Sequence, residues 1–307
     1  MMIVVLTGGT GGAKLLQGLN SEMKSEELFI ICNTADDCVM QGLHVSPDLD
    51  TVTYALAGVL DPSKGWGIKN DSFTVLESLG RFGDETWFRL GDRDLATHIT
   101  RTRLLRDGMS LSEATRKICQ AYGVETAVVP MSDNRVETKV VTPNGILSFQ
   151  EYFVRNHWAD ECESILFEGA ETSRPAPGVL EAIETAAAVV LCPSNPVTSI
   201  GPILAVPGIR EALRDTEATV AAVSPLVQGR PFSGPAHKFM ASRGLEVSSF
   251  GIAQAYQDFL DVLFIGTEDG SLVTRIKDLG IQPLATSIQL DSVEEKQRLA
   301  RELLNTV

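Results

Sequence analysis

The first 32 residues constrain the fold more than any other part of the chain. Met2 to Leu6 is a continuous apolar run, typical of a strand buried on both faces of a parallel sheet. A glycine-rich turn follows at Gly8 to Gly12, and Ala13 to Leu19 then has helical spacing. Leu28 to Cys32 is a second apolar run. This order of strand, turn, helix and strand predicts a parallel sheet with right-handed crossovers.

The same alternation returns in the second half of the chain. Ala188 to Cys192, Ala218 to Val223 and Phe259 to Ile265 have the composition of short buried strands. Val293 to Leu304 has the spacing of an amphipathic terminal helix. We therefore expect an α/β fold whose core is a Rossmann-like parallel sheet.

The middle of the chain is predicted to be more helical. Asp94 to Arg106 has helical character, and a second helix is expected over Ala114 to Tyr122. Ser110 and Glu113 form a capping-box pattern ahead of that second helix, and Gly123 suits the position after its end.

A β-hairpin is expected near the centre of the chain. Its strands would be Glu137 to Thr142 and Ile146 to Phe153, joined by Pro143, Asn144 and Gly145. A hairpin within an α/β chain suggests a smaller inserted subdomain. The predicted division is a core of residues 1–108 and 178–307 and an insertion of residues 109–177.

Composition limits the function classes. The 26 Lys and Arg residues and 40 Asp and Glu residues give a net charge of −14, which disfavours a nucleic-acid surface but allows a phosphorylated small molecule. We expect a cytoplasmic protein, because the N-terminus lacks a signal-peptide pattern and no apolar run reaches about 18 residues. The five cysteines are widely spaced and indicate buried thiols in a reducing compartment: Cys32, Cys38, Cys119, Cys162 and Cys192.

The glycine-rich turn is the first candidate binding site. Gly8, Gly9, Thr10 and Gly11 lie between a strand and a helix, where backbone N–H groups can hold a phosphate, and Lys14 follows them. The turn lacks the residues of a P-loop and the third glycine of a dinucleotide-binding fingerprint. A tight turn without a ligand is the alternative.

Four acids follow the second strand in two groups. Asp36 and Asp37 come after Asn33, Thr34 and Ala35, and Asp48 and Asp50 lie two residues apart. Oxygen ligands of this kind suit Mg²⁺, which binds one or two carboxylates together with substrate phosphates. The alternative is an Asx turn for the first group and a helix cap for the second.

A charge-rich segment begins at Arg89. Asp94, His98 and Arg101 share one helix face by their spacing, and Arg89 or Arg93 could contact an anion or a ring. A solvated charged face is the alternative.

The remaining candidates lie in the second half of the chain. Ser194, Asn195 and Ser199 follow a strand end, where hydroxyl and amide groups can contact phosphate or a base, although a capped turn would use the same residues. His157 and His237 are isolated, so nucleophilic triads and zinc hydrolysis have no support.

Taken in order, these segments resemble the 2-phospho-L-lactate transferase family, the CofD/FbiA family of coenzyme F420 biosynthesis. The resemblance runs from the first strand to about residue 265. The segments that carry it are Gly8 to Gly11, Asn33 to Asp37, Ser46 to Thr51, Leu90 to His98, Pro193 to Pro196, Ser199 to Ile203, Ser224 to Pro225 and Tyr256 to Leu260.

The resemblance implies a Mg²⁺-dependent transferase of Rossmann-like fold with a smaller subdomain, and a homodimer. Its substrates would be lactyl-2-diphospho-5′-guanosine and Fo, a 5-deazaflavin with a ribityl chain. The ribityl hydroxyl would take the phospholactate group, giving F420-0, and GMP would leave. Some bacterial members use the phosphoenolpyruvate analogue, so phospholactate, phosphoenolpyruvate and phosphoglycerate donors stay open.

The resemblance also implies roles for individual residues. Asp50 is the expected catalytic residue, which orients the Fo hydroxyl or accepts its proton, and Arg89 and Thr34 are further expected Fo contacts. Asp36, Asp37 and Asp48 are the expected Mg²⁺ ligands. The expected nucleotide and diphosphate contacts are Gly8, Gly9, Thr10, Gly11, Lys14, Ser194, Asn195 and Ser199.

Two other functions compete with this interpretation. One is a non-enzymatic regulator that binds a nucleotide or UDP-sugar, like the YvcK-like proteins, whose fold is similar. The segments Pro47 to Thr51 and Gly91 to Asp94 favour the transferase. The other is an NAD-linked dehydrogenase, which the missing third glycine disfavours.

Overall fold

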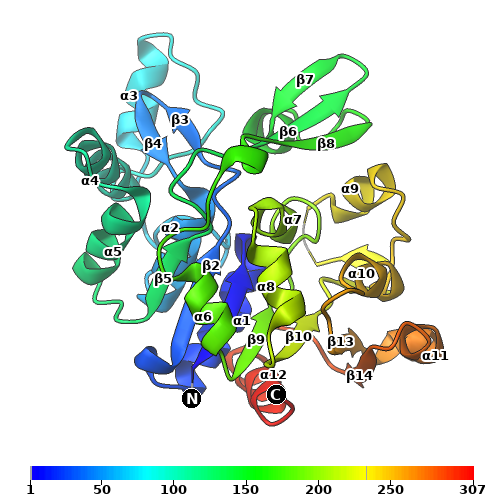
Figure 1. The fold of residues 1–307 in the computed structure, drawn as a ribbon. Helices are drawn as coiled ribbons and strands as arrows, with labels where there is room; N and C mark the ends of the chain where they lie inside the picture. The colour runs from blue at the N-terminus through cyan, green and yellow to red at the C-terminus, as the bar shows by residue number, and fades with distance from the viewer. Residues whose placement is uncertain (1, 233) are drawn as a thin grey trace.

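A computed structural model describes residues 2–232 and 234–307. Within them, the largest sheet has seven strands, all parallel, in the order β14-β13-β10-β9-β1-β2-β5 (Figure 1). The expected Rossmann-like α/β core is therefore confirmed. Its strands are β1 (Ile3–Thr7), β2 (Leu28–Cys32), β5 (Ala127–Pro130), β9 (Ala188–Leu191), β10 (Thr219–Val223), β13 (Val262–Gly266) and β14 (Gln282–Thr286).

The direction of chain travel through this sheet reverses beside β1. The first half of the chain adds β2 and β5 on one side of β1, and the second half adds β9, β10, β13 and β14 on the other. In sheets of this type, ligands bind outside the carboxyl ends of the strands at such a reversal. The loops after β1 and β9 meet at this position.

The central strand β1 is buried on both sides, because helices cover both faces of the sheet. Val4 and Leu6 belong to one apolar cluster, and Ile3 and Val5 belong to the other. The helices on the first face are α6 (Val179–Thr185), α7 (Ile200–Ala205), α8 (Ile209–Asp215), α9 (Ala236–Ser242), α10 (Ser249–Ala255) and α11 (Val273–Lys277). Those on the second are α1 (Gly9–Glu22), α2 (Pro47–Leu56), α5 (Leu111–Ala121) and α12 (Val293–Leu304).

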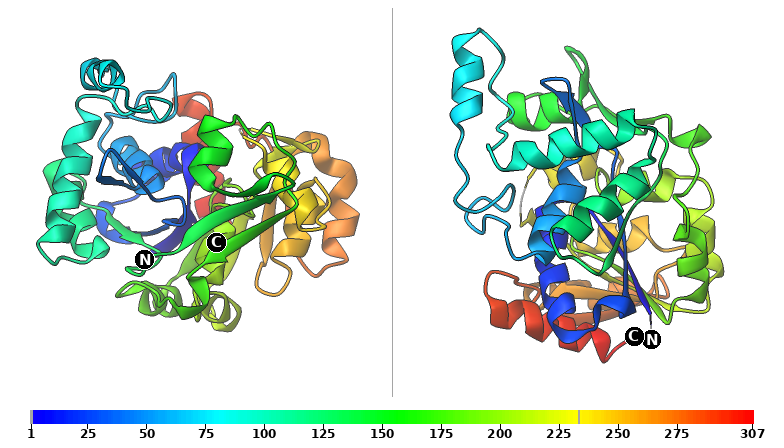
Figure 2. Two further views of the ribbon diagram at one scale, coloured as in Figure 1. Left: turned by 90° about the horizontal axis from the view of Figure 1, so that it is seen from above. Right: turned by 90° about the vertical axis from the view of Figure 1, so that its left-hand side faces the viewer.

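Smaller elements lie beyond the carboxyl ends of the central strands, on the side away from the two termini (Figures 1 and 2). They include α3 (Thr74–Arg81), α4 (Asp94–Arg106) and a hairpin of β3 (Cys38–Met40) and β4 (Leu43–Val45). A three-stranded antiparallel sheet combines β6 (Glu137–Thr142), β7 (Gly145–Ser148) and β8 (Ser164–Glu168). A further short ribbon pairs β11 (Leu226–Val227) with β12 (Arg230–Pro231).

The expected hairpin is present, but its second strand is shorter than the sequence suggests. Thr142 pairs with Gly145, so Pro143 and Asn144 form the turn. The strand ends at Ser148, and the chain then forms a π-helical turn over Glu151–Arg155. Ser148 Oγ donates to the Glu151 carboxylate and accepts from the Glu151 N–H, which turns the chain at this point.

The predicted insertion at 109–177 differs from the structure at its N-terminal end. Helix α5 packs on the central sheet, and β5 is that sheet's edge strand. The capping box of Ser110 and Glu113 opens α5 as expected. The separate antiparallel sheet begins only at Glu137. Four residues in β5 gave too short an apolar run to be recognised as a strand of the core.

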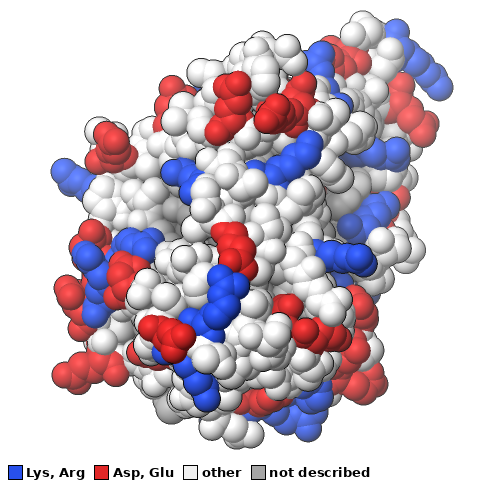
Figure 3. Space-filling view, turned by 90° about the vertical axis from the view of Figure 1, so that its right-hand side faces the viewer, with Lys and Arg blue, Asp and Glu red and all other residues white. Residues whose placement is uncertain are grey.

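The surface carries charges of both signs. On the face drawn in Figure 3, blue and red side chains alternate over α9, α10 and α11 instead of forming one basic region. Among the described residues, none of the helices has the length and apolar character needed to cross a membrane.

Candidate functional site

One cavity of about 500 Å³ opens at the reversal in strand order. Its lining includes the glycine turn after β1, the start of α2, the loop after β9 and an aromatic set from outside the central sheet. The predicted site residues that line it are Gly8, Gly9, Thr10, Gly11, Asp36, Asp48, Asp50, Arg89, Ser194, Asn195 and Ser199.

The glycine turn is held against the loop after β9. The Gly8 N–H donates to Ser194 Oγ at 3.2 Å, and the Ser194 hydroxyl donates to the Gly8 carbonyl at 2.7 Å. A Cβ atom at Gly11 would lie 2.4 Å from the carbonyl oxygen of Pro193. Glycine at this position therefore lets two loops, 186 residues apart in sequence at Gly8 and Ser194, approach each other at the cavity.

Two carboxylates, Asp36 and Asp48, line the cavity and are almost fully buried. Burial raises the pKa of Asp48 to about 6, although hydrogen bonds from Asn33 and the Gly9 backbone act in the opposite direction. Burial, followed by the charge of Asp48, raises the pKa of Asp36 well above its usual range. The charge of Asp48 thus acts against ionisation of Asp36, which burial already disfavours.

Two of the three predicted metal ligands are suited to a cation. Asp36 Oδ1 is buried and has no hydrogen-bond partner among the described residues, and a divalent ion would relieve its repulsion with Asp48. Asp37 does not line the cavity: its Oδ2 accepts from Ser46 Oγ at 2.7 Å and lies 3.0 Å from His44 Nε2, while its Oδ1 is also buried without a partner among the described residues. Across residues 2–232 and 234–307, no three His, Cys, Asp or Glu side chains form a complete metal-binding group.

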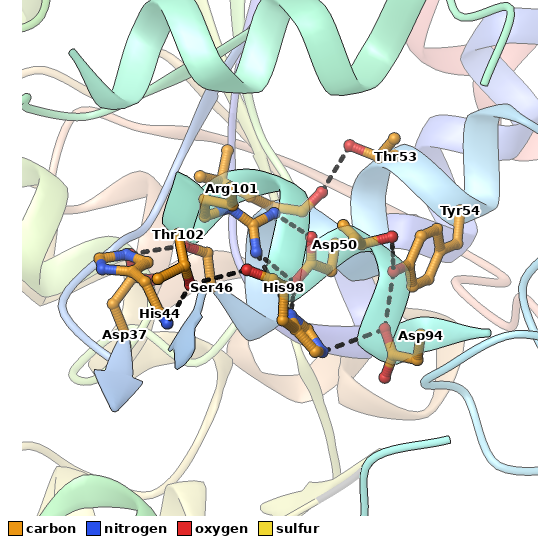
Figure 4. A network of polar contacts seen from close by, with 12 residues as sticks. Asp37, His44, Ser46, Asp50, Thr53, Tyr54, Asp94, His98, Arg101 and Thr102 are labelled. Carbon is orange, nitrogen blue, oxygen red and sulfur yellow. Dashed lines mark hydrogen bonds and ion pairs between the residues drawn. The ribbon is translucent and has the colours of Figure 1, made fainter. Parts of the chain in front are cut away.

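Asp50 has a different environment from the other two acids. It lines the cavity, yet it is ion-paired to Arg101, which is fully buried. His98 and Asp94, also on α4, lie beside this pair, and Figure 4 shows the group together with Tyr54 from α2. The predicted helix face of Asp94, His98 and Arg101 is therefore buried and is not a solvated surface.

Aromatic residues form the part of the lining that sequence reasoning missed. Phe149 and Phe153 stack at 5.3 Å with an interplanar angle of 8°, and Trp158 stacks on Phe153 at 5.2 Å. Lys238 Nζ donates to the Trp158 carbonyl at 2.6 Å and holds this segment. The aromatic wall is defined here as Trp66, Trp87, Phe88, Phe149, Phe153, Trp158 and Phe232.

A weak signal for this wall was present in the sequence. Phe149, Tyr152, Phe153 and Trp158 fall within ten residues, in a chain with only 6% aromatic residues. The sequence predicts a strand as far as Phe153, and alternate side chains of a strand point to opposite faces. A shared aromatic surface was therefore not expected here. In the π-helical turn Glu151–Arg155, Phe153 and Val154 instead both reach the cavity.

Two predicted contacts lie outside the cavity. Lys14 Nζ is 2.8 Å from Asp291 Oδ1, near the start of α12, and its side chain is 42% exposed. Thr34 is buried and does not line the cavity. Asn195 does line it, but its Oδ1 accepts from the backbone N–H groups of Val197 and Thr198, so that oxygen closes a turn.

The fold and the cavity together define a doubly wound α/β protein with a ligand site at its topological switch point. The model of the family 2-phospho-L-lactate transferase CofD matches residues 3–304, and the chain belongs to this family. The alternative of a YvcK-like regulator is not favoured by this match.

Relatives of similar length carry two different names. A 2-phospho-L-lactate transferase of Methanococcoides burtonii is 40% identical, over 99% of this chain and 98% of its own. One of Methanothermobacter thermautotrophicus is 42% identical, over 100% and 98%. A phosphoenolpyruvate transferase of Streptomyces coelicolor is 41% identical, over 99% and 97%. Identity therefore does not separate the two donor types.

A solved structure supports the fold. The crystal structure of a member of the UPF0052 family from Bacillus halodurans has a TM-score of 0.65 to this chain and covers 98% of both chains. The sequences are only 17% identical, so the likeness concerns the fold alone.

Proposed function

We propose that the protein transfers a phosphorylated three-carbon acid from a guanylylated donor to the ribityl hydroxyl of Fo. The hydroxyl oxygen attacks the diphosphate phosphorus next to the acid. The bond from that phosphorus to the bridging oxygen of GMP breaks, GMP leaves, the hydroxyl proton passes to Asp50 or to the leaving phosphate, and the product is a phosphodiester. The observation that carries the proposal is a single cavity that joins a glycine turn to an aromatic wall in a chain of the CofD family.

The glycine turn supports the donor side of the proposal. Gly9 to Gly11 line the cavity at the beginning of α1, where the helix dipole and N–H groups without a partner inside the helix favour a phosphate, although the Gly9 N–H contacts Asp48. Ser199 and Asn195 lie on the loop facing this turn and are suited to the guanosine end. In a chain of net charge −14, backbone N–H groups attract an anion without a basic surface.

The aromatic wall supports the acceptor side. A deazaflavin is a flat, largely apolar ring, and stacked aromatic side chains provide surfaces for such a ring. Arg89 lines the same cavity, with its guanidinium 4.4 Å from the ring centre of Phe73, and can contact polar ring atoms. The preformed stack of Phe149, Phe153 and Trp158 reduces the ordering needed on binding.

The carboxylates would divide two tasks. Asp50 would accept a hydrogen bond from the attacking hydroxyl and so orient it toward phosphorus. Asp36 and Asp48 would hold Mg²⁺, which supplies charge neutralisation at the diphosphate when it is bound. Such a transfer depends mainly on positioning and on charge stabilisation, so an oriented acceptor and a held diphosphate account for most of the catalysis.

The test is a turnover assay with each donor separately. The purified protein is incubated with Fo, Mg²⁺ and the guanylylated form of phospholactate, phosphoenolpyruvate or phosphoglycerate, and GMP and product mass are followed. We expect GMP and the phosphodiester to form in equal amounts with at least one donor, and product to stop when EDTA is added.

Two outcomes would contradict the proposal. Nucleotide binding without product from any donor would favour a regulator. GMP release that is independent of Fo would indicate a hydrolase, because the acceptor would then be water.

A further inference from the structure

The carboxylate of Asp50 is held from behind by a buried arginine. Arg101 Nη1 donates to Asp50 Oδ2 at 3.1 Å, and Nη2 donates to Oδ1. Arg101 is 1% exposed and does not line the cavity, whereas Asp50 does. The guanidinium, seen beside Asp50 in Figure 4, therefore binds both oxygens of a carboxylate that also lines the cavity.

His98, Asp94 and Tyr54 lie next to this pair and, unlike Arg101, also line the cavity. His98 Nδ1 is 3.5 Å from Asp50 Oδ2, and its Nε2 is 3.2 Å from Asp94 Oδ1. The Tyr54 hydroxyl donates to the same Asp94 oxygen at 2.6 Å. His98 Nδ1 is also 3.4 Å from Arg101 Nη1, and Asp94 is fixed by Tyr54 of α2, the helix that carries Asp50.

The bidentate contact with Arg101 fixes the orientation of the Asp50 carboxylate. A guanidinium that binds both carboxylate oxygens fixes the plane of the carboxylate and its χ angles, which a point charge does not. Each oxygen has a second lone pair, so Asp50 can still accept a hydrogen bond from the cavity side. The ion pair also offsets the cost of burying the Asp50 carboxylate.

We propose that Arg101 is a positioning residue for Asp50, and that His98, whose Nδ1 lies 3.4 Å from Arg101 Nη1, helps to hold the guanidinium. The inference rests on the proposed role of Asp50 at the acceptor hydroxyl. Without the bidentate contact, the Asp50 carboxylate would rotate, and the hydroxyl of Fo would no longer be oriented toward phosphorus. The donor, bound at the glycine turn, would be little affected.

A double-mutant cycle tests this inference. Arg101→Lys keeps a positive charge but cannot bind both oxygens in one plane. We expect kcat/KM for Fo to fall about 100-fold, the size of effect that a misplaced reacting group produces, while KM for the donor stays within about twofold. In an Asp50→Asn background, the same Arg101→Lys change should reduce kcat/KM less than about threefold further, because its target is already gone.

Arg103→Lys is the matched control. Arg103 lies on the same helix, but its side chain is 62% exposed and pairs with Asp107 at 3.4 Å. We expect its kinetic constants to equal those of the wild type. Thermal unfolding of every variant, with and without donor, shows which proteins are folded.

His98→Gln extends the test if Arg101→Lys does not fold. It should show the same pattern with a smaller loss, about tenfold in kcat/KM for Fo, and the same lack of additivity with Asp50→Asn. Full additivity with Asp50→Asn, or an equal rise in KM for donor and acceptor, would overturn the inference. These results differ from failure of the proposed function, in which the wild type itself forms no product.

Discussion

The two walls of the cavity are built in different ways. The glycine side comes from loops that leave β1 and β9, so the central sheet fixes its backbone. The aromatic wall comes from segments beyond that sheet, chiefly residues 149–158, and consists of side chains. A phosphate is recognised by backbone N–H groups and a ring by side-chain surfaces, so the two walls should respond differently to mutation.

The largest expected effect is on the glycine side. In Gly11→Ala, the new Cβ atom would lie 2.4 Å from the Pro193 carbonyl oxygen, and a backbone atom cannot move aside as a flexible side chain can. We expect the turn to move away from the β9 loop and kcat/KM for the donor to fall about 100-fold, because small displacements of positioning groups have effects of this size. Steady-state kinetics at saturating Fo would measure this loss.

Gly270→Ala is the control for this variant, because no atom lies within 4 Å of its Cβ position. It should retain wild-type kinetics and stability. If Gly11→Ala binds the donor normally, the glycine turn is a structural turn and the comparison between the walls fails.

The next effect concerns the pH dependence of stability at Asp48, which lies beside the glycine turn. The folded pKa of Asp48, about 6, exceeds its ordinary value of 3.8. The neutral carboxyl therefore stabilises the fold below pH 4, and this contribution is lost as pH rises through 6. Asp48→Asn removes the titration, so we expect the variant to be more stable than the wild type at pH 8 by up to about 3 kcal/mol and similar to it at pH 4.

Urea unfolding at both pH values, without metal, would measure the difference. Addition of Mg²⁺ at pH 8 should stabilise the wild type and not the variant, because the ion binds only the folded carboxylates. Asp84→Asn, at an exposed position, serves as the control. Equal stability of wild type and Asp48→Asn at pH 8 would show that Asp48 is not strained by burial.

The fold was largely predictable, because its signals are local. The apolar runs at β1, β2, β9 and β10 and the spacing of α12 identified those elements to within a residue or two. The strand β5 was not recognised because it has only three apolar residues before Pro130, the residue that ends it. Its place at the sheet edge depends on pairing with β2, about 100 residues earlier in the sequence.

The site was predictable where a strand end fixes it. The glycine turn and Ser194 meet because the carboxyl ends of β1 and β9 are neighbours, and Asp48 reaches this position from the start of α2. The partner of Asp50 was not identified, because Arg101 looks like one more charge on a charge-rich helix until α4 is packed against α2. The aromatic wall likewise depends on tertiary contacts, such as the one from Lys238 to Trp158.

A smaller effect is expected at the aromatic wall. Phe153→Ala removes the ring that lies between Phe149 and Trp158, and a lost stacking surface for a flat ring costs about 1–3 kcal/mol. We expect KM for Fo to rise about tenfold and KM for the donor to stay within about twofold. Phe82→Ala is the control, because Phe82 is 86% exposed and lies outside the cavity. An equal rise in both KM values would mean that the wall shapes the whole cavity instead of serving Fo.

The smallest effect is expected at Lys14. This residue tests directly whether the glycine side binds phosphate through its backbone alone. The sequence suggests that this lysine holds the diphosphate, but its ammonium pairs with Asp291 at an exposed position. If backbone N–H groups bind the phosphates, Lys14→Ala should change KM for the donor less than about twofold, and loss of the surface pair should cost less than about 1 kcal/mol. Asp291→Asn, which releases Lys14 without removing it, should likewise change KM for the donor less than about twofold. A tenfold rise in donor KM for Lys14→Ala alone would mean that the side chain leaves Asp291 when the donor binds, so that the glycine side also uses a side chain for phosphate.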